Sequence, residues 1–178
     1  MDIMDVGTFS AKYADWFGRV KPLLEQANWK DAFAAGFPTP VNSDAPWAAP
    51  RQPLSRSKLA LLSTAGLYLP GEQPPFDAAN IEGDWTFREL PRDVDTARLA
   101  IAHGHYNHAS ARQDINAVFP LQRLKELEAD GVIGALAPTA FMTSGYCTRL
   151  DKIATETAPR IVARLRQDQV DAVLHIPV

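Results

Sequence analysis

Three short apolar runs, separated by segments with helical spacing, constrain the fold of this 178-residue chain more than any other feature. The runs cover residues 58–64, 132–138 and 171–178, and each is nearly continuous in apolar residues. Such runs are typical of parallel strands that are covered on both faces. Residues 149–166, between the last two runs, have the apolar spacing of an amphipathic helix, which Pro159 should kink. This order predicts an α/β fold with a mostly parallel, Rossmann-like sheet and helices on both of its faces.

The amino-terminal third predicts helices and then a connector. Residues 8–26 have the spacing of an amphipathic helix that is interrupted or ended near Pro22, and residues 29–37 predict a second short helical turn. Residues 38–53 are rich in proline, which excludes a central strand or an unbroken helix. We therefore expect a proline-rich, extended connector there, with Trp47 as its anchor.

Four further elements are predicted between and after the apolar runs. Residues 84–90 alternate like a half-exposed edge strand, and residues 99–102 form a short buried strand that ends at a His-Gly break. A helix is expected from Pro120 to Gly131, because proline suits the first turn of a helix and glycine suits its end. Residues 139–146, rich in Thr, Ser and Gly, are predicted to form a loop.

The length and the hydrophobic content of 46% fit one α/β domain with a lead-in segment. We expect residues 1–57 to form the amino-terminal helix and lead-in, and residues 58–178 to form the α/β domain. No helix follows the last predicted strand, so one face of the sheet is short of cover and the domain is incomplete at its carboxyl end. A homo-oligomer, or a longer protein, would cover that face.

Charge and hydropathy limit the partners that we expect. A net charge of −3 with scattered Lys and Arg disfavours a nucleic acid or an anionic membrane as partner. No stretch has the pattern of a signal peptide or of a membrane span, so we predict a cytoplasmic protein with a small-molecule substrate. A dinucleotide fingerprint is absent too, which disfavours dehydrogenase chemistry.

The loop after residue 102 concentrates the polar chemistry. Three of the four histidines, His103, His105 and His108, fall within six residues at the predicted end of a strand. Imidazoles in such a loop can donate hydrogen bonds, transfer protons or bind a metal. The three histidines are therefore metal candidates, although their spacing is much less diagnostic than a helical His-Glu-x-x-His motif, and we commit to no metal.

Two polar residues follow the histidine loop. Asp114 and Asn116 can cap the helix expected near Phe119, or they can orient His103, and both interpretations stay open. With His103 they are the candidates for supporting catalytic roles.

Two glycine-containing turns are expected at the same sheet edge. Gly66 follows the first strand, and Ser144 and Gly145 lie in the predicted loop after residue 138, so their N–H groups could bind a substrate carboxylate. With His105 and Tyr106 they are the candidate substrate-binding residues. The single cysteine, Cys147, excludes an internal disulfide and is better explained as a half-buried thiol than as a nucleophile.

Several motifs of residues 58–178 resemble the selenoprotein B family of glycine, sarcosine, betaine and D-proline reductases, and in size and spacing the D-proline reductase type above all. The matching segments, in chain order, are Leu62-Ser-Thr-Ala-Gly66, Gly83-Asp-Trp-Thr-Phe-Arg88, His103-Gly-His-Tyr106, Asp114-Ile-Asn116, Phe119-Pro120, Arg123-Leu-Lys-Glu-Leu127, Gly131-Val-Ile-Gly-Ala-Leu-Ala-Pro138 and Asp171-Ala-Val-Leu174.

The resemblance implies a selenol- or thiol-dependent reductase that reductively cleaves a small amine or amino-acid-like substrate, with His103 as a hydrogen-bonding or acid/base residue. In the family the last matching strand leads into the catalytic selenocysteine or cysteine, which this chain lacks. We therefore expect Val178 to precede a UGA codon and the 178-residue chain to be an inactive amino-terminal part. The resemblance also implies a pyruvoyl group on a separate partner subunit. The alternative is a dimeric, non-catalytic remnant of the family that binds a small ligand or a metal.

Overall fold

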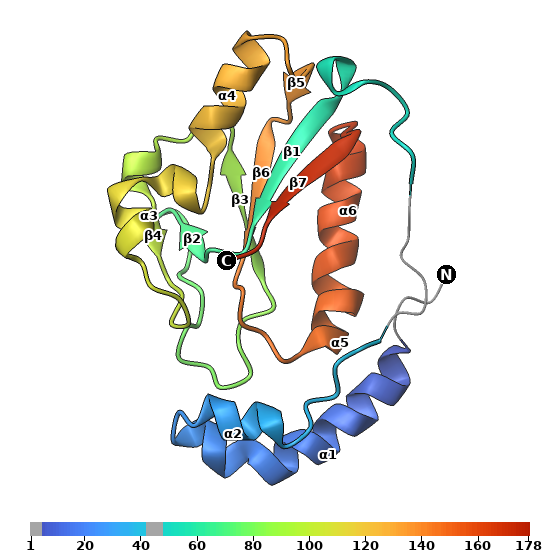
Figure 1. The fold of residues 1–178 in the computed structure, drawn as a ribbon, viewed down its shortest axis with the longest axis vertical. Coiled ribbons are helices and arrows are strands. Elements are labelled where there is room, and N and C mark those ends of the chain that lie inside the picture. Colours follow the sequence, from blue (N-terminus) through green and yellow to red (C-terminus); the bar gives the residue numbers. More distant parts are fainter. Residues whose placement is uncertain (1–4, 42–47) are drawn as a thin grey trace.

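The computed structural model describes residues 5–41 and 48–178 and has a five-stranded sheet at its centre (Figure 1). The central strand β1 pairs in parallel with β5 and β6 on one side and with β7 on the other, whereas β3 runs antiparallel to β6. The mostly parallel sheet of an α/β fold is therefore confirmed. The strands are β1 (Lys58–Ser63), β3 (Phe87–Pro91), β5 (Ala135–Leu136), β6 (Thr139–Thr143) and β7 (Ala172–Ile176).

Helices and a small second sheet surround these strands. Strands β2 (Leu67–Tyr68) and β4 (Ala100–Ile101) pair antiparallel to each other, apart from the main sheet. The helices are α1 (Val6–Glu25), α2 (Trp29–Ala34), α3 (Ala109–Gln113), α4 (Leu121–Ala129), α5 (Leu150–Lys152) and α6 (Ala158–Gln167). Single turns of 3-10 helix cover Leu54–Arg56, Thr96–Arg98 and Ile115–Ala117.

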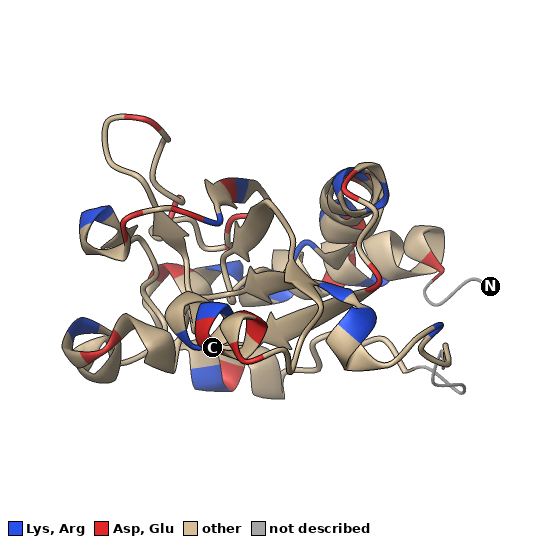
Figure 2. Cartoon of the chain, turned by 90° about the horizontal axis from the view of Figure 1, so that it is seen from above, with Lys and Arg blue, Asp and Glu red and all other residues tan. Residues whose placement is uncertain are grey.

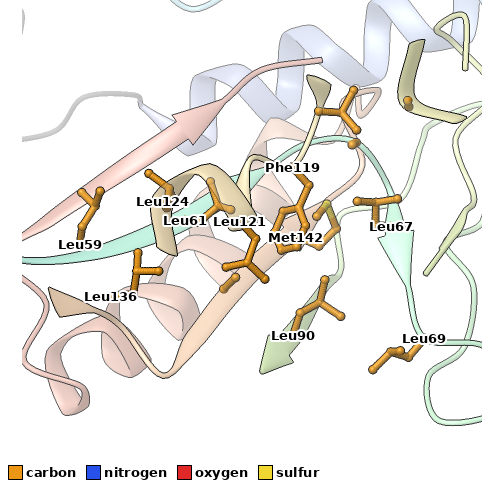
Figure 3. Close-up of a cluster of buried hydrophobic side chains, with 14 of the residues drawn as sticks. Leu59, Leu61, Leu67, Leu69, Leu90, Phe119, Leu121, Leu124, Leu136 and Met142 are labelled. Carbon is orange, nitrogen blue, oxygen red and sulfur yellow. The ribbon is translucent and has the colours of Figure 1, made fainter. Parts of the chain in front are cut away.

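Helices α4 and α6 cover opposite faces of the sheet. Leu61 of β1 and Leu124 of α4 belong to the same buried cluster, so α4 packs on the face that Leu61 presents. The strand register places Glu89 of β3 on the other face, where Arg164 of α6 donates a 3.1 Å hydrogen bond to its carboxylate. The α4 face holds the main core, and Figure 3 labels several of its members, among them Leu61, Phe119 and Leu124.

Strand β7 is less covered than the sequence predicts. Its residues alternate between half-buried and exposed, and Val173 keeps 41% of its surface exposed. The prediction of a fully buried strand is wrong, because β7 is an edge strand whose outward face α6 does not fully cover. His175 lies on this exposed face and therefore is not a core residue.

Two strand predictions are wrong in the middle of the chain. Thr139–Thr143, predicted to be a loop, is strand β6, and four of its five residues are buried. Residues 99–102, predicted to form a buried strand of the sheet, contain only the half-buried two-residue β4, which pairs with β2. The three central residues of β6 are apolar and buried, and its two threonines are β-branched and pack well in a strand. The Thr, Ser and Gly of residues 143–145, at its end, were misleading.

The prolines disturb the helices less than predicted. Helix α1 continues past Pro22 to Glu25, because Pro22 lies in its last turns, where the lost hydrogen bond falls on exposed backbone. Near Pro159 the sequence predicts a kink within one helix. The structure instead has α5, a π-helical turn at Ile153–Thr157 and then α6, with Pro159 in the first turn of α6, where proline fits without breaking a helix. Strand β3 begins at Phe87, later than predicted, because Asp84 accepts hydrogen bonds from Thr86 and forms a turn.

The connector can be described only in part. Trp47, its predicted anchor, lies outside the described residues.

Acidic and basic residues are interspersed on the helices and loops of the described chain (Figure 2). Every helix in these residues is too short or too polar to span a bilayer.

Helices α1 and α2 form a second apolar cluster around Trp16, whose indole N–H donates a hydrogen bond to the Ala32 carbonyl oxygen. Polar contacts join this cluster to the loops below the sheet. The Tyr13 hydroxyl donates a 2.7 Å hydrogen bond to Glu82 and lies 2.9 Å from the hydroxyl oxygen of Thr148. Arg149 completes the group with an ion pair to Glu82.

Replacing Tyr13 by phenylalanine should lower the free energy of unfolding by about 1 to 2 kcal/mol, because Glu82 and Thr148 then lose a buried hydrogen-bond partner. Urea denaturation followed by circular dichroism measures the loss. Tyr68→Phe is the matched control, because within residues 5–41 and 48–178 the Tyr68 hydroxyl makes no hydrogen bond. Equal losses in the two variants would mean that the Tyr13 contacts do not stabilise the docking of α1.

Candidate functional site

The carboxyl ends of three parallel strands meet at one edge of the sheet. Thr64 follows β1, Gly145 follows β6, and Val178 follows β7. The Val178 N–H donates a 2.9 Å hydrogen bond to the Thr64 hydroxyl oxygen, and Ala65 forms an isolated antiparallel bridge with Ser144. The two glycine-containing turns expected at the same sheet edge are thus adjacent.

His103 lies at the centre of this edge. Its side chain is buried, and the residue keeps 5% of its surface exposed. The His105 N–H lies 3.1 Å from the Nδ1 atom of His103, and the Gly145 N–H lies 3.0 Å from its Nε2 atom. Burial, aided by the nearby His105 and His108, lowers the pKa of His103 to about 4, so the ring is neutral at pH 7.

Aromatic rings pack around the histidine loop. The ring of His105 lies 4.1 Å from that of Tyr146, and Trp29 of α2 contacts both rings at centroid distances of 5.0 and 5.2 Å. Tyr106 packs against His103 at 4.9 Å. Helix α2 lies beyond the end of the sheet at which β1 and β7 finish, as Figure 1 shows. The aromatic wall formed by Trp29, His105 and Tyr146 therefore joins the amino-terminal helices to the site.

The predicted substrate-binding residues differ in the groups that they still offer. Gly66 donates its N–H to Thr143 and accepts a hydrogen bond from Ala102, so both of its backbone groups are used within the protein. An added Cβ there would lie 2.8 Å from the Ala102 carbonyl oxygen, which explains the glycine at a φ of +67°. Tyr106 donates its hydroxyl to Ala65. Among the predicted N–H donors, that of Gly145 faces His103, whereas that of Gly66 is bonded to Thr143 although the glycine itself lies against His103.

Asp114 and Asn116 form a local cap. The Asp114 carboxylate accepts hydrogen bonds from the backbone and side-chain N–H groups of Asn116, and this caps the 3-10 turn Ile115–Ala117. The capped element is therefore this turn and not the following helix α4. No hydrogen bond in the described residues joins either side chain to His103. The structure does not bring these two candidates to the histidine.

The three histidines of the loop do not converge on one point. The Nε2 atom of His108 lies 2.8 Å from the backbone carbonyl oxygen of His103, which turns that ring nitrogen towards the main chain. Both ring nitrogens of His103 face backbone N–H groups. Within residues 5–41 and 48–178, no three His, Cys, Asp or Glu side chains are arranged to hold a metal ion.

Cys147 is held away from nucleophilic chemistry. Burial raises the pKa of its thiol to about 11, so very little thiolate exists at neutral pH. We expect iodoacetamide to label Cys147 in the native chain at least about 100-fold more slowly than in urea, where the thiol regains an ordinary pKa. Mass spectrometry of timed samples measures both rates. Similar rates in the two conditions would contradict the burial of this thiol.

Three residues of the site were missed by the sequence reasoning. Thr64 ends the first apolar run and lies in the matching segment Leu62–Gly66, but no feature of the sequence singles it out from its neighbours. Trp29 and Tyr146 carry no local signal, because they reach the histidine loop through tertiary packing of distant segments.

Comparisons with known proteins identify what the chain is similar to. The family model described as glycine/sarcosine/betaine reductase selenoprotein B (GRDB) matches residues 16–176. The D-proline reductase subunit gamma of Acetoanaerobium sticklandii is 30% identical over 135 residues, which cover 76% of this chain and 54% of that relative. The glycine reductase complex component B subunit gamma of Symbiobacterium thermophilum is 28% identical over 171 residues, which cover 95% of this chain and 39% of the relative.

A third relative, the betaine reductase complex component B subunit beta of Peptoclostridium acidaminophilum, is 26% identical over 158 residues, or 88% of this chain and 36% of the relative. The chain thus spans about half the length, or less, of these curated relatives. No solved structure shows significant similarity to the fold.

Proposed function

Because the chain belongs to the glycine/sarcosine/betaine reductase selenoprotein B family, we propose that it is the amino-terminal part of a selenol- or thiol-dependent reductase. Its substrate is a small amine or an amino-acid-like compound, which is cleaved reductively. The observation that carries this proposal is the meeting of His103 with the carboxyl ends of β1, β6 and β7, because α/β sheets bind their ligands at that edge.

His103 has the properties of a hydrogen-bonding residue at this site. Its pKa of about 4 keeps the ring neutral at pH 7, so it has little cationic form with which to act as a general acid. A neutral ring can still donate one N–H and accept one hydrogen bond. His103 therefore orients the substrate or the nucleophile by hydrogen bonding. The backbone N–H of Gly145 is a second hydrogen-bond donor next to it.

The site fits a selenocysteine or cysteine supplied after β7. A selenolate or thiolate provides a nucleophile that needs no dedicated base when its pKa lies below the ambient pH. A residue that followed Val178 would begin beside Gly145, since the Val178 carbonyl oxygen would lie only 2.7 Å from a Cβ added to Gly145. Uncharged donors on Gly145, His103 and Thr64 suit an anionic side chain there.

The proposal extends to the assembly. All three relatives are named as subunits, and two of them as parts of a reductase complex, which supports a multi-subunit assembly. We propose that a partner subunit bears the pyruvoyl group that the resemblance implies. The open edge of β7 also favours a homo-oligomer, whose mass light scattering would reveal.

The first experiment reads the gene beyond the Val178 codon. We expect UGA, followed in frame by a cysteine-containing turn and a helix. A UAA or UAG codon, or UGA with no coherent reading frame after it, would refute the reductase and favour a ligand-binding remnant of the family.

The second experiment assays the longer protein, with selenocysteine or cysteine at that codon and together with its partner subunit, for cleavage of the carbon–nitrogen bond of glycine, sarcosine, betaine and D-proline by a dithiol. Cleavage releases ammonia or an amine from the first three substrates, and it opens the ring of D-proline to give one linear amino acid. We expect one of these substrates to react and His103→Gln to lower kcat/KM at least about 100-fold. His175→Gln, on the exposed face of β7, is the matched control and should keep full activity. A fully active His103→Gln enzyme would remove His103 from the mechanism.

A further inference from the structure

A pocket lies at the end of the sheet opposite to the candidate site. It has a volume of about 770 Å³ and opens between residues 48–51 of the connector and the turn that joins α6 to β7. Figure 1 shows that this turn and the start of β1 lie at the same end of the sheet, away from the carboxyl terminus. A pocket of this volume is large enough for a small organic molecule.

Two exposed arginines line this pocket. Arg51 belongs to the connector, and Arg166 belongs to the last turn of α6. In the part of the chain that the structure describes, no ion pair or hydrogen bond holds either guanidinium group. Arg164, on the same helix as Arg166, is instead paired with Glu89 and Asp168. Arg164 therefore already supplies a positive charge at the carboxyl end of α6, and the guanidinium group of Arg166 remains available for a ligand.

Hydrogen bonds join the two walls of the pocket. Gln52 follows Arg51 in the chain, and its side-chain amide donates a 2.9 Å hydrogen bond to the carboxylate of Asp171. The same amide donates to the Arg56 carbonyl oxygen at 2.9 Å, and the Lys58 N–H donates to the Asp171 carboxylate at 2.8 Å. The connector and the turn before β7 are thus fixed to each other and to the sheet. A site whose walls are already in place loses less conformational entropy when a ligand binds.

The other lining residues limit the kind of anion that fits. Asp171 uses one carboxylate oxygen, Oδ2, in both of the contacts just described, so its other oxygen can accept a hydrogen bond from a ligand hydroxyl group. Its negative charge also repels a ligand with many charges. Ala48, Pro50 and Val170 add apolar surface to the walls. The pocket therefore combines two cations, one acceptor and apolar walls.

We propose that Arg51 and Arg166 bind the phosphate group of a small phosphate monoester in this pocket. A guanidinium group donates two parallel hydrogen bonds to an oxyanion, and the three free oxygens of a phosphate monoester can accept from two such groups at once. A carboxylate, with two oxygens, is filled by one of them. Asp171 accepts a hydroxyl group of the organic part and disfavours a di- or triphosphate. This site goes beyond the proposed function, because it lies at the other end of the sheet and takes no part in the cleavage reaction.

An NMR titration of the 178-residue chain tests this pocket, with inorganic phosphate and glycerol 3-phosphate as probes. Both should produce saturable shifts of the side-chain Nε–H signals of the two arginines and of the Ala172 amide signal. Glycerol 3-phosphate should bind about tenfold more tightly than phosphate, because its hydroxyl groups can donate to Asp171. Sodium chloride at the same ionic strength should not produce the shifts. Equal affinities for the two probes would overturn the assignment to a monoester.

Three arginine variants test the guanidinium groups. Arg51→Gln and Arg166→Gln should each weaken the binding of glycerol 3-phosphate at least about tenfold, because each loses a charge-assisted, bidentate contact. Arg112→Gln is the matched control, because Arg112 is also exposed and lies on α3, outside this pocket. It should leave the affinity unchanged. Equal weakening in all three variants would mean that only the net charge of the chain matters, and would refute the site.

The same spectra locate the bound anion. If the probes shift the Gly145 amide signal and leave that of Ala172 unchanged, they bind at the other end of the sheet and the pocket is refuted. Shifts that never saturate with either probe would refute it as well. Cleavage of the carbon–nitrogen bond by the longer protein is a separate measurement, so the proposed function and this pocket can fail independently.

Discussion

Gly83→Ala should lower the free energy of unfolding by about 3 kcal/mol or more. Gly83 has a φ of +83°, in the left-handed region that only glycine adopts readily. A Cβ added there would lie 2.2 Å from the Tyr146 carbonyl oxygen and 2.6 Å from the Cys147 Cα atom. Both of these atoms belong to the backbone, so no flexible side chain can move aside, and the main chain has to separate.

Gly131→Ala is the matched control for this prediction. Gly131 also has a positive φ, +71°, but an added Cβ there would meet nothing within 4 Å. Gly131→Ala should lower the free energy of unfolding by only about 1 kcal/mol, because the backbone conformation alone opposes the substitution. Urea denaturation followed by circular dichroism gives both values. Equal losses would show that the contact between Gly83 and the Cys147 segment is not maintained.

The Gly83 contact matters for the candidate site as well as for stability. Gly83 forms an isolated antiparallel bridge with Cys147, which lies two residues after Gly145. The bridge holds the loop after β6 against the loop before β3, and Thr148 donates its N–H to Glu82 beside it. A variant that separates these loops should therefore also displace Gly145 from His103, which the Gly145 amide signal would report.

The elements that the sequence predicted well are those with a strong local pattern. Strand β1 has a nearly continuous apolar run, and α4 has leucines at helical spacing between a proline and a glycine. Burial and helix ends are encoded locally in such segments. The class of the fold followed from their order along the chain.

The errors concern segments whose environment is set by distant residues. β6 begins and ends with threonine and continues into the loop-like Thr-Ser-Gly of residues 143–145, yet it pairs with β1 and β3 and four of its five residues are buried. The run before β4 is apolar, but its partner is β2 in a separate small sheet. Neither pairing leaves a mark in the local sequence, because strand pairing depends on tertiary contacts.

The residues of the candidate site also fall into those that the sequence predicted and those that depend on distant contacts. His103 and Gly145 were predicted from residue type and from their expected place at strand ends, and the structure brings them within hydrogen-bonding distance. Asp114 and Asn116, chosen for their chemistry, serve a local turn instead. Trp29 could not be predicted, because its contact with His105 depends on how α2 packs against the site.

Acidification should destabilise the folded chain through His103. Burial, with His105 and His108 nearby, lowers the pKa of His103 from 6.5 to about 4. Because the unfolded chain then binds a proton more tightly than the folded chain, the contribution of His103 to stability is fully present above about pH 6.5 and is lost as the pH falls towards 4. Between pH 7 and about pH 4.5 the loss should be about 2 to 3 kcal/mol.

The comparison of two histidine variants isolates this effect. The glutamine of His103→Gln cannot titrate. The free energy of unfolding of this variant should therefore change much less than that of the wild type between pH 7 and about pH 4.5, even if the variant is already less stable at pH 7. His175→Gln, on the exposed face of β7, should keep the wild-type pH dependence. Burial lowers the pKa of His105 too, so a smaller residual slope is expected in the His103 variant.

If the His103→Gln profile is as steep as that of the wild type, the ring does not stay neutral in the folded chain. The burial of His103 between its two backbone N–H groups would then be wrong, and with it the hydrogen-bonding role.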